Sequence, residues 1–407
     1  MSTSTVLATF SVLKDHVKLK VTEDRAVIDN IVFRLHYRLT FLALVAGSIL
    51  VSARQFIGDH IKCIVDSSLP AHVVDTFCFF TSTYTVKKHM NSSMVELGHV
   101  PHPGVGCATK DDEITHHTYY QWVPFVLFFQ ALLFYIPHYL WRNAEGGRLK
   151  MLVSGLHLAS LALRDEQMQI EGGKTIPSRF DRDEKIRQIR TAFLNRLHVN
   201  RPWAYYLSFC EVLNFMNVMV QIYLTDLFLG GAFLGLGITL TESEYGHKMS
   251  PLDIIFPKVT KCMFHKYGPS GTIQTHDALC IMALNIVNEK IYSFLWFWFI
   301  ILAIISGLGL VWRILTMVLH ARSKAFNRYI FSLACPGKYN PWNVLKLTHE
   351  YHFGDWLFLY YIAKNLDNYV FKELLEQLAH DLEDRRAARF KQFNIPTLQE
   401  QEPLKKA

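Results

Sequence analysis

The sequence predicts an all-α membrane protein with four transmembrane helices, disulfide-linked extracellular loops and a helical cytosolic domain. Three observations support this fold class: four long apolar runs, an uneven distribution of lysine and arginine, and two pairs of cysteines beside the apolar runs. The chain has 407 residues, of which 50% are hydrophobic, and a mean hydropathy of +0.13. Because the apolar residues are clustered, they favour membrane spans over two or three soluble domains.

Each apolar run is predicted to be one membrane-spanning helix, since runs of 18 or more apolar residues are rare in soluble cores. The predicted spans are residues 39–55, 121–141, 203–229 and 291–319. The uncharged part of the first span is Leu39–Ala53, which has 15 residues. This is short for a bilayer, which needs about 20 residues, but the side chains of Arg38 and Arg54 can extend to the membrane surface. We expect Pro137 to kink or end the second span. Glu211 in the third is expected to form interhelical hydrogen bonds rather than to conduct ions.

The topology follows from the positions of lysine and arginine. Residues 1–38, 142–202 and 320–407 contain six, twelve and thirteen of them, whereas residues 54–121 and 230–290 contain five each. Under the positive-inside rule, residues 1–38, 142–202 and 320–407 are therefore cytosolic. The expected regions are a cytosolic N-terminal helix and linker (1–38), extracellular loops (56–120 and 230–290), a cytosolic loop (142–202) and a cytosolic tail (320–407). No cleavable signal peptide is visible, so the first span is predicted to be a signal anchor. Topology and anionic lipid explain the net charge of +7 without a nucleic-acid partner.

The cysteines agree with this topology. Five of the seven lie in the two outer segments: Cys63, Cys78, Cys107, Cys262 and Cys280. The outside of a cell is oxidising, so disulfides are expected there. No CxxC pair is present, which makes a structural zinc site a poor alternative. Cys107 is the odd member, either a free thiol or a partner in a reshuffled pair. A glycosylation sequon at Asn91 lies in the first outer segment.

The chain lacks the motifs that mark common enzyme classes. It has no P-loop, no GxSxG and no HExxH. His349 and His352 lie three positions apart, whereas the histidines of HExxH lie at i and i+4. We therefore expect no enzymatic activity, no cofactor and no metal site, and interpret the chain as a channel or docking protein.

Several stretches together resemble a known family. The start of the second predicted span reads Tyr119, Tyr120, Gln121, Trp122 and Val123. This YYQWV sequence is similar to the signature of the innexins, the invertebrate gap-junction proteins related to the pannexins. Further innexin-like stretches are Asp24–Asn30, Phe256–Cys262, Lys266–Gly268, Asn285–Tyr292, Phe294–Phe299 and Gly354–Trp356. The resemblance covers roughly residues 20–390, and two cysteines per outer loop also fit it.

The resemblance implies a plasma-membrane channel at gap junctions. Innexins form rings of commonly eight subunits, and two rings dock between cells, so ions and small metabolites pass passively. The implied partners are identical subunits, a second ring, other innexins and membrane lipid. The implied disulfides are Cys63–Cys280 and Cys78–Cys262. The implied pore-lining residues belong to the N-terminal helix, the first span and the start of the first loop: Ser2, Thr3, Ser4, Arg54, Gln55 and Asp59.

Four positions differ from the family pattern. Arg54 stands where a neutral polar residue is common, and His60 where proline is usual. Cys107 is an additional cysteine, and a glycan on Asn91 would hinder docking, as is thought for pannexins. A ring of Arg54 side chains facing the pore would disfavour cations. Two alternatives therefore stay open: a non-junctional hemichannel that releases small molecules, and an adhesion or scaffolding subunit that does not conduct.

Overall fold

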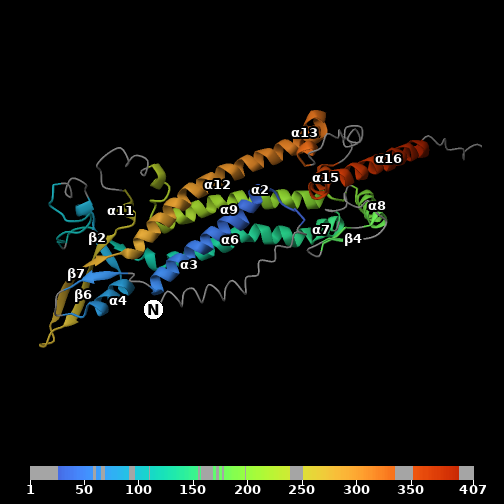
Figure 1. Cartoon of the computed structure of the whole chain (residues 1–407). Coiled ribbons are helices and arrows are strands. Elements are labelled where there is room, and N and C mark those ends of the chain that lie inside the picture. The colour runs from blue at the N-terminus through green and yellow to red at the C-terminus, as the bar shows by residue number, and fades with distance from the viewer. Residues whose placement is uncertain are drawn as a thin grey trace, which may run out of the picture. The chain divides into compact units, whose positions relative to one another are not determined.

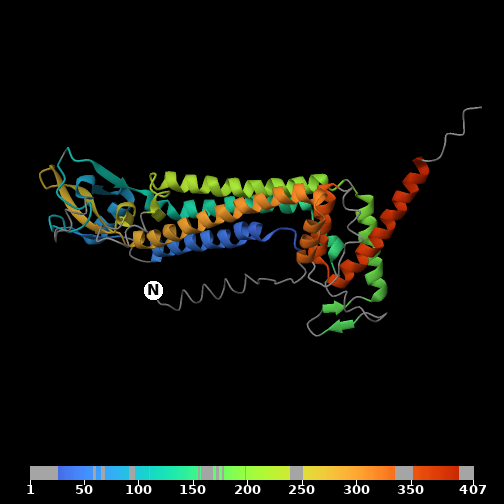
Figure 2. The ribbon, with the colours of Figure 1, turned by 90° about the horizontal axis from the view of Figure 1, so that it is seen from above.

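The structure is a computed structural model of the chain (Figures 1 and 2). It describes residues 26–57, 61–65, 69–90, 97–109, 111–154, 156, 168–170, 174–176, 178–197, 199–238, 251–334 and 352–393. The chain divides into two compact units. The membrane unit consists of residues 29–144 and 206–314, and the cytosolic unit of the described parts of residues 1–28, 145–205 and 315–407.

Four segments are long and apolar enough to cross a membrane (Figure 1). They are Ile31–Gln55, α6 (Val123–Glu145), α9 (Arg201–Phe228) and α12 (Ala283–Arg322). The four-span prediction is thereby confirmed. At 1.5 Å per residue, the 40 residues of α12 span about 60 Å, roughly twice the hydrocarbon thickness of a bilayer, so its ends extend beyond the membrane.

The first spanning segment is longer than its apolar run. It comprises α2 (Ile31–Arg34), a π-helical segment (Leu35–Thr40) and α3 (Phe41–Ile57). Asn30 caps α2, because its side-chain oxygen accepts the Phe33 N–H at 2.7 Å. The His36 side chain is buried, and its Nε2 atom lies 2.8 Å from the Ser306 hydroxyl. The polar start of this span is therefore helical because its side chains have partners on the same and other helices.

Helix α6 continues through Pro137 to Glu145. Of the two expected effects of this proline, it does not end the helix, which extends about two turns beyond it. Pro124 lies in the first turn of α6, where a missing N–H removes no intrahelical hydrogen bond. Its carbonyl accepts the Ser48 hydroxyl at 2.8 Å, which fastens α3 to α6.

The outer loops form a β-sheet that the sequence did not predict. The all-α expectation holds for the spans but not for these loops. The sheet has the order β1-β7-β6-β2-β3. Its strands are β1 (Lys62–Ile64), β2 (Thr83–Val86), β3 (Ile114–His117), β6 (Val259–Tyr267) and β7 (Ile273–Ile281). All pairs are antiparallel. Since β1 to β3 belong to the first loop and β6 and β7 to the second, one sheet joins both.

Short helices complete the extracellular part. They are α4 (Ala71–Thr81), α11 (Pro251–Ile255) and the 3₁₀ turns Lys87–Met90 and Tyr119–Gln121. The core beneath the sheet contains Val74, Cys78 and Phe256, all essentially inaccessible to solvent. The apolar core of the extracellular part is therefore continuous with the core between the outer ends of the spans.

The cytosolic unit is mainly helical. Its elements are α7 (Arg148–Val153), β4 (Met168–Ile170), β5 (Lys174–Ile176), α8 (Arg179–Asn195), α13 (Lys324–Ala334), α15 (Phe353–Asn365) and α16 (Asn368–Phe393). Ion pairs join α8 to α16, with Arg182 bound to Glu373 at 2.8 Å and Arg190 to Asp381 at 3.0 Å. Asp367 caps α16, since its side chain accepts the Tyr369 N–H at 3.2 Å.

The Gly354–Trp356 stretch is a packing centre of the cytosolic unit. A Cβ at Gly354 would lie 2.6 Å from the Asn200 carbonyl oxygen, so only glycine fits there. Asp355 is buried and accepts the Asn200 amide at 2.9 Å. Trp356 donates its indole N–H to Asn327 at 2.9 Å. These contacts fix the start of α15 to neighbouring segments.

Candidate docking and pore elements

Two disulfides hold the extracellular sheet together. Cys63 in β1 bonds to Cys280 in β7, and Cys78 in α4 bonds to Cys262 in β6. Cys63 and Cys280 are also direct register partners in the sheet, with their Cα atoms 4.0 Å apart. Each bond connects the first loop to the second, in the pairing that the family resemblance implies.

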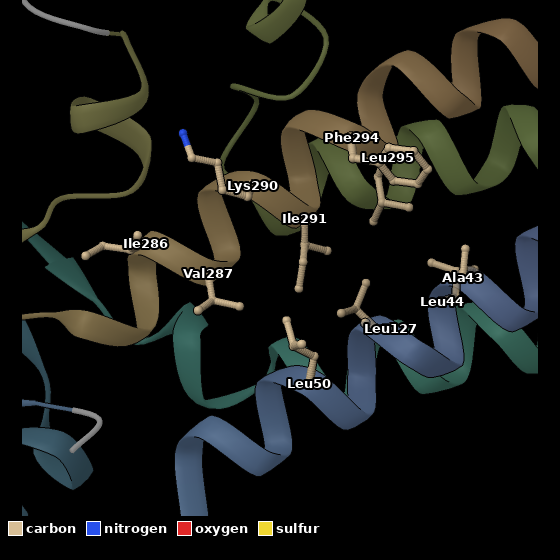
Figure 3. A pocket seen from close by; sticks show the side chains of 11 residues that line it. Ala43, Leu44, Leu50, Leu127, Ile286, Val287, Lys290, Ile291, Phe294 and Leu295 are labelled. Carbon is tan, nitrogen blue, oxygen red and sulfur yellow. The ribbon is translucent and has the colours of Figure 1, made fainter. Parts of the chain in front are cut away.

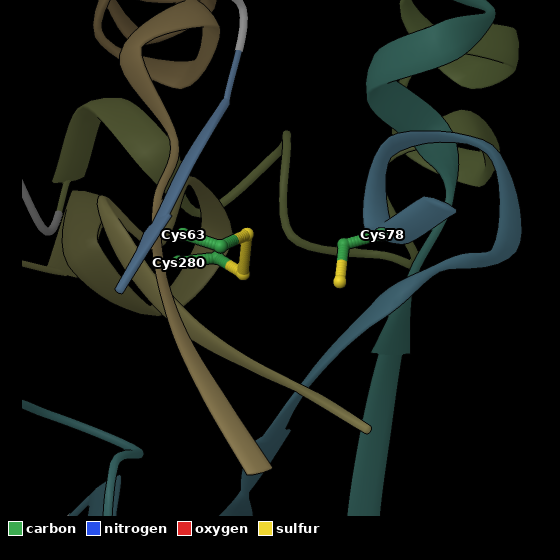
Figure 4. A group of neighbouring side chains, drawn as sticks. All are labelled: Cys63, Cys78 and Cys280. Carbon is green, nitrogen blue, oxygen red and sulfur yellow. A yellow bond between two sulfur atoms is a disulfide. The ribbon is translucent and has the colours of Figure 1, made fainter. Parts of the chain in front are cut away.

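The Cys63–Cys280 disulfide lies close to Cys78 (Figure 4). The sulfur atoms of Cys63, Cys78 and Cys280 all fall within 4.8 Å of one another. A metal ion would need free thiolates, and all three of these sulfurs are oxidised. The cluster is therefore a structural staple, in which a thiol freed at one bond would lie within reach of the other.

The YYQWV residues hold the end of α4. The last carbonyls of a helix have no intrahelical partner. Tyr120 donates its hydroxyl to the Phe79 carbonyl at 3.2 Å, and Gln121 donates its amide to the Phe80 carbonyl at 3.3 Å. Burial raises the pKa of Tyr120 to about 12, so its hydroxyl remains a donor at physiological pH. The signature thus fixes the helix that bears Cys78.

The remaining signature residues fasten the sheet to the spans. Tyr119 packs edge-on against Phe256, with ring centroids 5.9 Å apart, and Phe256 stacks on Tyr292 of α12 at 5.7 Å. Burial raises the pKa of Tyr119 well above its ordinary value. Trp122 is 60% exposed, as expected for an aromatic residue at the membrane interface. Three innexin-like stretches therefore meet in one aromatic cluster.

Lys258 anchors the base of the second loop. Its ammonium group lies 2.9 Å from Asp253 and 3.1 Å from the buried Glu289 of α12. Burial alone would lower the pKa of Lys258, but hydrogen bonds to these carboxylates outweigh it and raise the pKa. Asn285 donates its amide to the Pro257 carbonyl at 2.9 Å. The strand β6 therefore starts from a fixed point on the fourth span.

The hairpin of β6 and β7 carries exposed side chains at its tip. Tyr267 and Ile273, the last pair before the turn, are 76% and 65% exposed, and Met263, four positions earlier in β6, is 44% exposed. The turn closes with a hydrogen bond from the Gly268 N–H to the Thr272 carbonyl at 2.8 Å. Gly271 has a φ of +80°, which side chains rarely adopt. The hairpin therefore presents apolar side chains on a shape fixed by its turn and by the disulfides at its base.

His117 is buried in β3. Its Nε2 lies 2.8 Å from the Thr85 hydroxyl of β2, and the side chain is 6% exposed. Burial lowers the pKa of His117 to about 4, with a smaller contribution from neighbouring His116. The neutral form is therefore the one that the folded sheet holds at physiological pH.

Acidification is expected to weaken this edge of the sheet. A histidine with a folded pKa below its ordinary value near 6.5 stabilises the fold above that value, and the stability is lost as the pH falls toward about 4. Hydrogen exchange of the β2 and β3 amides, corrected for intrinsic rates, measures the free energy of opening. This free energy should fall by up to about 3 kcal/mol over that range. The variant His117→Gln should flatten the response, whereas His116→Gln should largely retain it. An unchanged response in His117→Gln would assign the effect to another group.

The predicted pore residues are only partly within the described structure. Arg54 and Gln55 lie in the last turn of α3, and the Arg54 side chain is exposed. Ser2, Thr3, Ser4 and Asp59 lie outside the described residues, as does Asn91. Cys107 is an exposed free thiol, which agrees with one of its two predicted states.

A buried ion pair joins the third and fourth spans. Glu211 of α9 binds Arg313 of α12 through two hydrogen bonds of 2.6 and 2.5 Å. Asn30, which caps α2, donates its amide to the same carboxylate at 2.8 Å. Glu211 therefore has the interhelical role that the sequence predicted. Hydropathy alone gave no signal for the partner, because Arg313 lies inside the longest apolar helix.

Comparisons with known proteins agree with these features. The innexin family profile matches residues 29–382. The chain is 46% identical to innexin inx7 of Drosophila melanogaster over 379 residues, covering 92% of this chain and 85% of that protein. It is 45% identical to innexin inx2 of Schistocerca americana over 89% of this chain and 95% of that protein. It is 42% identical to innexin inx2 of Drosophila melanogaster over 91% and 96% of the two chains.

Proposed function

Because this chain belongs to the innexin family of gap-junction channel subunits, we propose that it forms large-pore intercellular channels that pass ions and small metabolites passively. The observation that supports this most directly is the single extracellular sheet built from both loops. Two disulfides hold that sheet together, and Lys258 anchors it to the fourth span. A surface that must meet its counterpart on another cell benefits from keeping its shape while unpaired.

The proposed docking element is the β6–β7 hairpin. Tyr267 and Ile273 at its tip, and Met263 farther along β6, are exposed apolar side chains of the kind that supply contact area in protein interfaces. An array of such hairpins, one per subunit of a ring (commonly eight subunits in the family), would meet a second array across the intercellular gap. The symmetric repetition would convert weak single contacts into stable docking through multivalency.

The direct test is junctional conductance between paired cells that both express this chain alone. Junctional current would support the proposal and show that the chain needs no different subunit. Membrane current in single cells without junctional current would favour the hemichannel alternative. Cell adhesion without either current would favour the scaffold. Removal of residues 1–20 separates a conducting channel from a scaffold. For a channel it should change conductance, whereas adhesion by a scaffold should stay intact.

Arg54 is proposed to line the outer part of the pore. Replacement of Arg54 by glutamate should shift the permeability ratio toward cations by about threefold or more, since a unit charge about 7 Å away in water changes the local concentration of a monovalent ion by about that factor. Reversal potentials under a salt gradient measure the ratio in single cells. Arg54→Lys is the matched control and should retain the original selectivity. Identical reversal potentials for all three proteins would remove Arg54 from the pore wall.

A further inference from the structure

An apolar cavity of about 430 Å³ lies among three of the spanning helices (Figure 3). Its walls come from α3, α6 and α12, all within the membrane unit. The residues that line the cavity include Ala43, Gly47, Leu50, Leu127, Lys290 and Ile291. The volume falls within the usual range for ligand pockets.

The cavity exists because α3 carries small residues where it faces α12. At Gly47, an added Cβ would lie 3.6 Å from Leu127 and 3.8 Å from Ile291, so a methyl group would contact the opposite walls and a larger side chain would fill the space. Ala43 precedes Gly47 by one helical turn and lies on the same face. The cavity therefore extends along the helices rather than across them.

The cavity lies near the outer membrane interface. Leu127 is little more than one turn from Trp122, the exposed aromatic residue that marks that interface. From Ile286 to Leu295, the α12 wall extends about 13 Å along the helix axis. An elongated apolar ligand therefore fits the cavity better than a compact one does.

One charged residue lies at the rim. Lys290 is the single charged residue among the described residues that line the cavity, and its side chain is 75% exposed. Its ammonium group points away from Leu50 and Leu127 (Figure 3). The Nζ atom of Lys290 lies 2.7 Å from one carboxylate oxygen of Glu289 and uses one of its three N–H groups there. The other oxygen of Glu289 lies 3.1 Å from the Nζ atom of Lys258. Lys290 thus retains donors for a second anion at the membrane surface.

We propose that this cavity binds one acyl chain of a phospholipid from the outer leaflet, with Lys290 contacting the lipid phosphate. The apolar walls match the chain, the cation at the rim matches the phosphate, and the position places both at the correct depth. Phospholipid is also the most concentrated apolar ligand around these helices. The proposed lipid site does not require a docked second ring.

Photolabelling tests the proposal on the full-length chain in phosphatidylcholine vesicles. The probe is a phosphatidylcholine with a diazirine in one acyl chain, and adducts are mapped by mass spectrometry. We expect adducts to be enriched on the cavity residues relative to Phe125 and Ile304, which are exposed on other parts of the spans. Gly47→Leu should reduce cavity labelling about tenfold, which corresponds to about 1.4 kcal/mol. Gly307→Leu lies outside the cavity on α12 and is the matched control, with unchanged labelling.

Leu50→Trp is a second variant that protects the test against misfolding. Leu50 is 54% exposed at the mouth, so the larger ring can enter the cavity without disturbing a packed core. It should reduce labelling as Gly47→Leu does. Cavity adducts no more frequent than those on Phe125, or enrichment that survives both variants, would overturn the proposal.

Lys290 is tested by the choice between two probes. A diacylglycerol with the same diazirine lacks the phosphate, so the native chain should favour the phospholipid about threefold, as expected for an exposed ion pair. Lys290→Gln should lose that preference and Lys290→Arg should keep it. A photoreactive amino acid at position 50 provides the opposing outcome: cross-links to a second copy of the chain would show that a neighbouring subunit, and not lipid, occupies the cavity.

Discussion

Replacement of Arg313 by methionine is expected to destabilise the membrane unit by about 3–5 kcal/mol. The change leaves Glu211 buried at 8% exposure with Asn30 as its remaining described partner, and a buried carboxylate without a cation is costly to keep ionised. Thermal unfolding in detergent, followed by tryptophan fluorescence, measures the loss. The start of the first span should loosen as well, because Asn30 binds the same carboxylate.

A double variant separates the ion pair from simple packing. Glu211→Gln combined with Arg313→Met removes both charges, and we expect it to recover most of the lost stability. Arg322→Met is the matched control, since Arg322 is an exposed arginine at the end of the same helix and its loss should change stability by less than about 0.5 kcal/mol. If Arg313→Met were as stable as the control, the ion pair would have no structural role.

Removal of the Cys78–Cys262 disulfide is expected to abolish junctional conductance. A lost disulfide in an extracellular domain typically costs about 2–5 kcal/mol. This bond attaches helix α4 to the sheet, whereas Cys63 and Cys280 are also aligned by the backbone pairing of β1 with β7. The double variant Cys78→Ser/Cys262→Ser should therefore lose more stability than Cys63→Ser/Cys280→Ser. Urea unfolding and paired-cell conductance measure the two effects.

The cysteines must be replaced in pairs. A single replacement would leave a thiol within reach of the neighbouring disulfide, and thiol–disulfide exchange would then scramble the pairing. Cys107→Ser is the matched control, because Cys107 is exposed and unbonded, and both stability and conductance should be unchanged. Equal stability of the two paired variants would contradict the distinction drawn between the two bonds.

The spans were predictable because lipid imposes a simple requirement: about 20 apolar residues in a helix that satisfies its own backbone. The start of the first span was not, because hydropathy counts each polar residue as unfavourable. Asp29 binds Arg34 at 2.9 Å, and His36 contacts Ser306 on another helix. Such compensation depends on a partner far away in the sequence. Pro137 likewise did not end its helix, because α6 continues to Glu145.

The extracellular sheet could not be predicted from local patterns. Strands β1, β2 and β3 have only three or four residues each. Strands β1 and β2 pair with β7 and β6 of the other loop, so no turn signal connects them, and β3 joins the sheet only through β2. Four cysteines allow three pairings, and spacing alone does not choose among them. The role of Tyr120 and Gln121 as caps of α4 was equally hidden, because the carbonyls that they bind lie about 40 positions earlier.

The sheet that joins both loops also sets the order of events during synthesis. Cys63 and Cys280 are 217 positions apart, so at about 5–20 residues per second the ribosome delivers the second about 10–45 s after the first. In that interval, Cys63 and Cys78 lack their native disulfide partners, and β1 and β2 lack the strands that they pair with in the second loop. We expect the nascent chain to depend on lumenal chaperones and oxidoreductases until β7 arrives. A messenger truncated after the third span would yield a protein that is correctly inserted yet unable to complete its sheet, and therefore retained before it reaches the cell surface.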